Sequence, residues 1–280
     1  MQELVSAGWL AGELGKPDLV VFDATYYLPP EGKSATALFE AAHIPGARFF
    51  DINAVADPET DLPHMAPTPG RAARMLGQLG ISNDARVVFY DQKGLFSAAR
   101  GWWLLRLFGH ERVAVLDGGL PKWQATGGTM EAGPATPAAP QTFWADFVTR
   151  RLSGIGDVKR VVADRSARIV DARPRGRFDG SAPEPRPGLP SGHMPGAANV
   201  PATDLLAADQ TMLPPEALRE IFAKAGIDAS KPIIASCGTG VTACVVALAL
   251  MRAGLPEPAI YDGSWTEWAA RPETAKEKTA

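Results

Sequence analysis

The sequence predicts an α/β protein with two tandem domains, each built from a mostly parallel β-sheet flanked by helices. Three observations lead to this prediction. The length of 280 residues suits two domains of ordinary size. Four short sequence blocks occur twice in the same order, at offsets of 145–150 residues. Within each copy, short apolar runs alternate with segments of helical periodicity, which favours parallel strands covered by helices on both faces.

The repeated blocks define the predicted domain boundaries. The block pairs are LVVFDA and RIVDA, HIPGA and HMPGA, RVVFYD and PIIASC, and VLDGG and IYDGS, beginning at residues 19 and 168, 43 and 193, 86 and 232, and 115 and 260. A Pro- and Ala-rich stretch separates the two copies, which is typical of a linker. We therefore expect a first domain over 1–128, a linker over 129–145 and a second domain over 146–280.

The helices and strands around the third block can be located from the sequence. In the first copy we expect a buried strand at Val87–Tyr90 and then a helix over 97–108. In the second copy the order is a helix over 214–225, a strand over 233–235 and a helix over 242–253. Ligands bind at the carboxyl ends of parallel strands. The loops that begin at Asp91 and Cys237 are therefore the first places to look for a site.

Composition excludes several classes of protein. The formal net charge is −3, and no basic excess of the kind that binds nucleic acid is present. The first residues lack the basic region of a secretory signal, and the apolar run at 244–251 is too short to span a membrane. Two cysteines and four histidines without ligand spacing predict no metal site and no cofactor. The expected location is the cytoplasm, with reduced thiols.

The loop Cys237-Gly-Thr-Gly-Val-Thr242 is the strongest candidate for chemistry. Two glycines between a strand and a helix let successive backbone N–H groups turn toward one point, which stabilises an anion there. A cysteine thiolate at that point is a nucleophile. We expect Cys244, on the apolar run of the next helix, to be a packing residue. The first copy has Asp91 in place of the cysteine and is expected to be non-catalytic.

These features together resemble the two-domain rhodanese family. The tandem blocks and the Cys loop carry the resemblance, and CGTGVT is closest to the loop of the 3-mercaptopyruvate sulfurtransferases. The resemblance implies that Cys237 takes up a sulfane sulfur as a persulfide and passes it to a thiol, such as thioredoxin or glutathione, or to cyanide. It also implies that the loop positions around the nucleophile bind the substrate: Gly238, Gly240, Val241 and Thr242.

Two arginines are expected to bind the substrate. Arg177 and Arg186 lie in GRF and EPR segments that match the arginines of the mercaptopyruvate enzymes. A guanidinium suits the carboxylate of an α-keto acid because it offers two parallel hydrogen bonds and keeps its charge. Thiosulfate is a dianion, and the Cys loop has no basic side chain for its second charge, so mercaptopyruvate is favoured. Arg173 and Arg175 are expected to be solvated.

The resemblance also implies a proton relay. His64 matches the family's loop histidine, which acts with the residue two after the cysteine, here Thr239, and with a carboxylate eleven residues before the histidine. That last position is Asn53, which can orient an imidazole but cannot stabilise its charge. The repeated histidines His43 and His193 occur in both copies and are expected to be structural.

Three alternatives remain. A thiosulfate:cyanide sulfurtransferase would differ only in its donor. A non-catalytic rhodanese-like binding module would keep the fold without turnover. A protein phosphatase needs an arginine six residues after the cysteine, where this sequence has Ala243.

Overall fold

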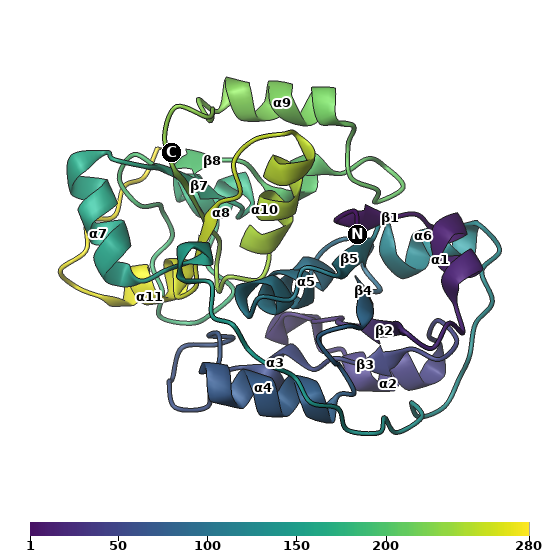
Figure 1. Ribbon diagram of the computed structural model, residues 1–280. Coiled ribbons are helices and arrows are strands. Elements are labelled where there is room, and N and C mark those ends of the chain that lie inside the picture. Colours follow the sequence, from purple (N-terminus) through teal and green to yellow (C-terminus); the bar gives the residue numbers. More distant parts are fainter. Residues whose placement is uncertain (280) are drawn as a thin grey trace. The chain divides into compact units, whose positions relative to one another are not determined.

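The computed structural model describes residues 1–279, and they divide into two compact units (Figure 1). Among these residues, the first unit comprises 1–58, 66–148 and 207–212, and the second comprises 59–65, 149–206 and 213–279. Each unit contains a five-stranded sheet in which every pairing is parallel. The predicted fold class is therefore confirmed.

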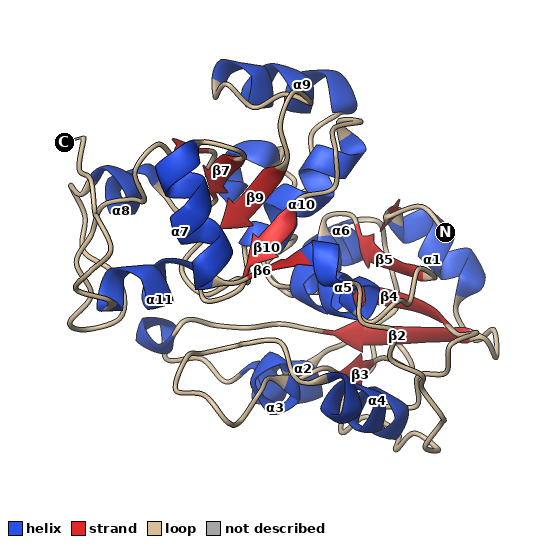
Figure 2. Cartoon of the chain, turned by 60° about the vertical axis from the view of Figure 1, so that its left-hand side comes forward, coloured by secondary structure: helices blue, strands red, loops and turns tan. Residues whose placement is uncertain are grey.

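The first unit has the strand order β1-β5-β4-β2-β3 (strands red in Figure 2). Its strands are β1 (Leu4–Val5), β2 (Leu19–Asp23), β3 (Arg48–Phe49), β4 (Arg86–Tyr90) and β5 (Val113–Leu116). Its α-helices are α1 (Ala7–Glu13), α2 (Ala35–Ala41), α3 (Ile52–Val55), α4 (Pro69–Gln78), α5 (Ala98–Leu107) and α6 (Gly119–Ala125).

The second unit repeats this order as β6-β10-β9-β7-β8. Its strands are β6 (Leu152–Ser153), β7 (Arg168–Asp171), β8 (Ala198–Asn199), β9 (Ile233–Ser236) and β10 (Ala259–Tyr261). Its α-helices are α7 (Ile155–Asp164), α8 (Arg175–Asp179), α9 (Pro215–Lys224), α10 (Ala243–Arg252) and α11 (Ser264–Ala270). The four repeated sequence blocks fall at corresponding strands of the two sheets, and the strands and helices expected around the third block lie where the sequence places them.

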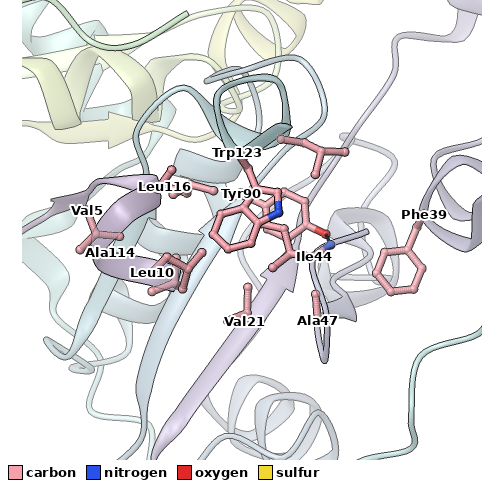
Figure 3. Close-up of a cluster of buried hydrophobic side chains, with 13 residues drawn as sticks. Val5, Leu10, Val21, Phe39, Ile44, Ala47, Tyr90, Ala114, Leu116 and Trp123 are labelled. Carbon is pink, nitrogen blue, oxygen red and sulfur yellow. Dashed lines mark hydrogen bonds between the residues drawn. The ribbon is translucent and has the colours of Figure 1, made fainter. Parts of the chain in front are cut away.

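A cluster of buried side chains covers one face of the first sheet (Figure 3). Trp123 and Tyr90 lie near its middle, and the Tyr90 hydroxyl accepts a hydrogen bond from the backbone N–H of Ile44 at 3.2 Å. The second unit has a matching cluster around Tyr261, Trp265 and Trp268. These aromatic side chains each remove a large apolar area from water, so they contribute strongly to the stability of both cores.

The division into units differs from the sequence-based boundaries 1–128, 129–145 and 146–280. Residues 59–65 pack with the second unit, where His64 hydrogen-bonds to Thr239. The predicted linker packs with the first unit, because Glu131 pairs with His43 in a β-bridge and the Gln141 N–H donates to the carbonyl of α4 residue 77. Ala280, the last residue of the predicted second domain, lies outside the described residues.

Residues 207–212 also join the first unit rather than the second. The Asp117 carboxylate accepts a hydrogen bond from the Met212 N–H at 2.7 Å, and Lys122 forms an ion pair with Asp209. Across residues 1–279, no helix combines the length and the apolar character needed to cross a membrane.

Candidate active site

Cys237 lies at the carboxyl end of β9, as the sequence predicts. Its backbone N–H donates to the Ser264 hydroxyl at 3.1 Å, and its carbonyl accepts from the Trp265 N–H at 2.9 Å. The side chain is 2% exposed. Both backbone groups are therefore fixed by the start of α11, which holds the cysteine at a defined point of the sheet edge.

The loop after Cys237 presents backbone donors ahead of α10. Gly240 has a φ of +77°, a left-handed conformation that favours glycine. Within residues 1–279, the N–H groups of Gly238, Thr239, Val241 and Thr242 have no protein acceptor. Such donors at a helix N-terminus stabilise an anion, and the thiolate of the adjacent cysteine is the anion that the sequence supplies.

The corresponding loop of the first unit contains a carboxylate that fills the same kind of cradle. One oxygen of Asp91 accepts from the N–H groups of Phe96, Ser97 and Ala98, each at 2.8 Å, and the other accepts from Lys93 at 2.9 Å. The Asp91 carbonyl also accepts from the residue-120 N–H, as the Cys237 carbonyl accepts from Trp265. The loop of the first copy therefore binds its own fixed anion.

His64 and Thr239 are brought together in the second unit. The His64 Nδ1 is hydrogen-bonded to the Thr239 hydroxyl at 2.9 Å, and both side chains are buried. His64 has a φ of +66°, so the backbone adopts an uncommon conformation at this residue. Asn53 is a residue of α3 in the first unit, where its N–H donates to the Asp51 carboxylate. Its part in a relay stays a prediction.

Arg177 lies directly against the Cys loop. A Cβ atom built at Gly238 would come within 3.0 Å of the Arg177 Nη2, so glycine at this position gives the guanidinium its close approach. The guanidinium is held by Glu184, which accepts from Nη2 at 2.5 Å and from Nε at 3.1 Å. Arg186 is half-buried, and its guanidinium makes no hydrogen bond or ion pair within the described chain.

The prediction that Arg173 is solvated is wrong. Its side chain is 1% exposed and its guanidinium binds the carboxylates of Asp171 and Glu184. Burial opposes the positive charge, but the two carboxylates outweigh it and raise the pKa of Arg173. The neighbouring Arg175 is exposed as expected, and it forms a surface ion pair with Asp204.

Comparison with known proteins identifies the fold family. A model of the rhodanese-like domain matches residues 6–126 and 155–271. The chain belongs to the rhodanese family. Human 3-mercaptopyruvate sulfurtransferase is 43% identical, with 96% of this chain and 93% of the human protein covered. Chicken thiosulfate sulfurtransferase is 41% identical, with 95% and 92% covered.

A solved structure supports the same family assignment. The crystal structure of SseA from Escherichia coli, described as a 3-mercaptopyruvate sulfotransferase, has a TM-score of 0.86 and 39% identity, covering 95% of this chain and 99% of that one. The relatives are curated sulfurtransferases, which supports sulfurtransferase activity for this rhodanese. The human protein is named for 3-mercaptopyruvate as its sulfur donor and the chicken protein for thiosulfate.

Sequence reasoning missed two residues of this rhodanese site. The Ser264 hydroxyl accepts from the Cys237 N–H and donates to the Tyr261 carbonyl, and the φ of Ser264 is +49°. The signal was present, because the repeated turn reads DGG in the first copy and DGS only in the copy with the cysteine. Glu184 carried no such signal, since a glutamate in a Pro-rich loop reads as a surface residue.

The two repeated histidines have the structural role that the sequence predicts. The His43 ring stacks on Phe39 at 4.1 Å and its Nδ1 is hydrogen-bonded to the Phe39 carbonyl at 2.8 Å. The His193 ring stacks on Phe178 at 4.0 Å, with the corresponding bond at 2.9 Å. Cys244 is buried in α10 and its thiol donates to the carbonyl of loop residue 240, so it packs as expected.

Proposed function

We propose that this rhodanese takes sulfur from 3-mercaptopyruvate, holds it as a persulfide on Cys237, and passes it to a thiol such as thioredoxin or glutathione, or to cyanide. The observation that carries the proposal is the approach of Arg177 to Gly238. It puts a guanidinium, the group that best binds a keto acid, beside the residue that follows the nucleophile. The full-length similarity to human 3-mercaptopyruvate sulfurtransferase supports the same donor.

The proposed first half-reaction forms one S–S bond and breaks one C–S bond. The Cys237 thiolate attacks the sulfur of mercaptopyruvate, and the electron pair of the C–S bond moves onto the former C3 carbon as the enolate of pyruvate. The proton of the substrate thiol ends on that carbon, which completes the methyl group. In the second half-reaction the acceptor takes the outer sulfur and restores the Cys237 thiolate.

The other site residues have roles that follow from their chemistry. Arg177 and Arg186 bind the carboxylate and the carbonyl oxygen of the donor. The hydrogen-bonded pair Thr239 and His64 moves the proton between the substrate sulfur and the carbon. The loop N–H groups, including that of Gly238, stabilise the thiolate and the persulfide anion.

The donor could instead be thiosulfate, the substrate named in the chicken relative. The two donors differ in charge, since thiosulfate is a dianion and mercaptopyruvate carries one carboxylate. The Cys loop contributes no cationic side chain, which favours the singly charged donor. We also expect a cytoplasmic location, because both cysteines are free thiols, as is usual in a reducing compartment.

A side-by-side steady-state assay tests this proposal. Pyruvate release from mercaptopyruvate and sulfite release from thiosulfate are measured with cyanide, glutathione or thioredoxin as acceptor. We expect a higher kcat/KM for mercaptopyruvate. A higher value for thiosulfate would make the chain a thiosulfate sulfurtransferase, and no product from either donor would make it a binding module.

A further inference from the structure

Four charged side chains form a continuous network of ion pairs that ends at the Cys237 loop. They are Asp171, Arg173, Glu184 and Arg177. Asp171, the last residue of β7, accepts from the Arg173 Nε and Nη2 at 2.6–3.1 Å. Glu184 accepts from the Arg173 Nη1 at 2.7 Å with one oxygen and from Arg177 with the other. Arg177 in turn lies against Gly238.

Arg173, an inner member of this network, also contacts the elements that hold the cysteine. The Arg173 guanidinium lies 4.4 Å from the ring centre of Trp265, whose backbone N–H donates to the Cys237 carbonyl. The guanidinium also donates to the Gly192 carbonyl at 2.7 Å. The network is therefore a fixed part of the site.

The four side chains carry no net charge. Two carboxylates face two guanidinium groups, and the shared member, Glu184, is 3% exposed, so water screens its charge little. Arg177 thus keeps its remaining N–H donors for a ligand, while its positive charge is already compensated. Arg186 is the arginine of the predicted binding pair whose charge has no partner in the described chain.

We propose that Glu184 is a specificity-determining residue, which compensates the charge of Arg177 and so restricts the site to singly charged sulfur donors. A carboxylate donor is then matched by one uncompensated guanidinium, while the second charge of thiosulfate has no partner. The inference rests on the proposed function for the identity of the preferred donor, but its effect on thiosulfate can be measured independently.

The variant Glu184→Gln removes the charge and keeps the shape of the side chain. The fold should persist because Asp171 and Arg173 remain a closed ion pair. The kcat/KM for thiosulfate should rise on the order of tenfold, since one buried charge near a dianion acts over a few ångströms in a poorly screened site. The rise should shrink at high salt. For mercaptopyruvate the value should stay the same or fall.

Two controls separate charge from geometry. Glu184→Asp keeps the charge but is too short to hold both arginines, so thiosulfate use should not rise. Glu273→Gln removes an exposed carboxylate paired with Lys159 and should leave both donors unchanged. A rise in thiosulfate use in Glu184→Gln alone supports the proposal. An unchanged or lower value, with an unchanged melting temperature, overturns it.

The wild-type enzyme provides a second test that does not depend on folding of a variant. With the charge of Arg177 compensated and that of Arg186 unpaired, kcat/KM for thiosulfate should fall with ionic strength only as much as one cation in the site requires. A steeper fall, of the size that two uncompensated cations give, would show that the charge of Arg177 also acts on the donor and would contradict the role of Glu184. Failure of the proposed function is distinct, because it appears as absent pyruvate release from mercaptopyruvate in the wild-type protein.

Discussion

The loops at the ends of β4 and β9 start from the same repeated sequence block and differ in the anion that they hold. In the first copy the Asp91 carboxylate occupies four backbone donors permanently. In the second copy Cys237 takes that position, and we propose that its thiol accepts and donates sulfur. A loop at the end of a corresponding strand therefore binds a fixed carboxylate in one unit, while in the other it leaves backbone N–H groups for the anion that the proposed reaction forms.

The two copies also differ in how they compensate a buried aspartate at the end of a corresponding strand. β2 ends at Asp23 and β7 ends at Asp171, both fully buried. Asp171 is paired with Arg173, two residues on. Asp23 has Thr25 at that position, so burial dominates over its hydrogen bonds and raises its pKa to about 6. At this position the second copy therefore has a buried arginine, and the first copy has a neutral threonine.

The largest effect is expected from replacing Cys237, the residue at which the two loops differ. Cys237→Ser should abolish sulfur transfer, because a hydroxyl in the same cradle does not ionise near neutral pH. Cys244→Ser, a matched change at a buried packing residue, should keep most activity. Pyruvate release and thermal unfolding of both variants provide the check. Loss of transfer in Cys244→Ser with full activity in Cys237→Ser would place the nucleophile elsewhere.

The next effect concerns the proposed proton relay through His64 and Thr239. His64→Ala should slow pyruvate formation by roughly 10²–10⁴-fold if proton transfer through Thr239 is general acid–base catalysis. Alkylation of Cys237 should proceed in the variant as in the wild type, because the contacts that hold the cysteine backbone come from Ser264 and Trp265 and not from His64. Turnover of His64→Ala at the wild-type rate would show that the loop amides alone carry the reaction.

Smaller losses are expected at the substrate arginines. Arg177→Ala and Arg186→Ala should each lower kcat/KM for mercaptopyruvate by roughly 10–150-fold, the equivalent of one charged hydrogen bond. The loss should be smaller for thiosulfate, which has no keto-acid group. Equal losses for both donors would mean that the arginines act through folding or through a general field.

The fixed anion of the first copy is tested by stability rather than activity. Asp91→Asn should destabilise the first unit by about 3–5 kcal/mol, because the amide weakens every bond from the loop and turns an N–H₂ group toward a donor. Hydrogen exchange of the amides of β4 measures this locally. Unchanged protection there would mean that the carboxylate is dispensable.

The last effect is a pH dependence of stability at Asp23. A folded-state pKa near 6, above the ordinary value near 3.9, means that the folded unit binds the extra proton, so stability falls as pH rises from about 4 to 6. The fall amounts to about 2–3 kcal/mol. Asp23→Asn should flatten it, as measured by hydrogen exchange of β2 across that range. A slope that persists in the variant would assign the titration to another group.

The fold could be predicted well from the sequence, because the same pattern of strands and helices occurs in both halves of the chain. Three of the four blocks lie on equivalent strands and the fourth directly precedes one in each copy, and periodicity locates the helices between them. Among the proposed site residues, Cys237, Thr239 and Arg177 were predicted from the loop and the resemblance, and the structure brings Arg177 to the Cys237 loop. The burial of Arg173 could not be predicted from the sequence, because it depends on an ion pair with Glu184, eleven residues away in an irregular Pro-rich segment. The sequence also does not predict that residues 59–65 pack with the second unit, because this depends on contacts between residues far apart in the chain.

The central claim is that Cys237 carries the transferred sulfur, and one measurement tests it directly. The wild-type protein is mixed with mercaptopyruvate without an acceptor, then analysed by intact mass and by peptide mapping. The account predicts one added sulfur atom per chain, located on Cys237, with one pyruvate released for each. Pyruvate release without added mass, or added sulfur on Cys244 in place of Cys237, would contradict it.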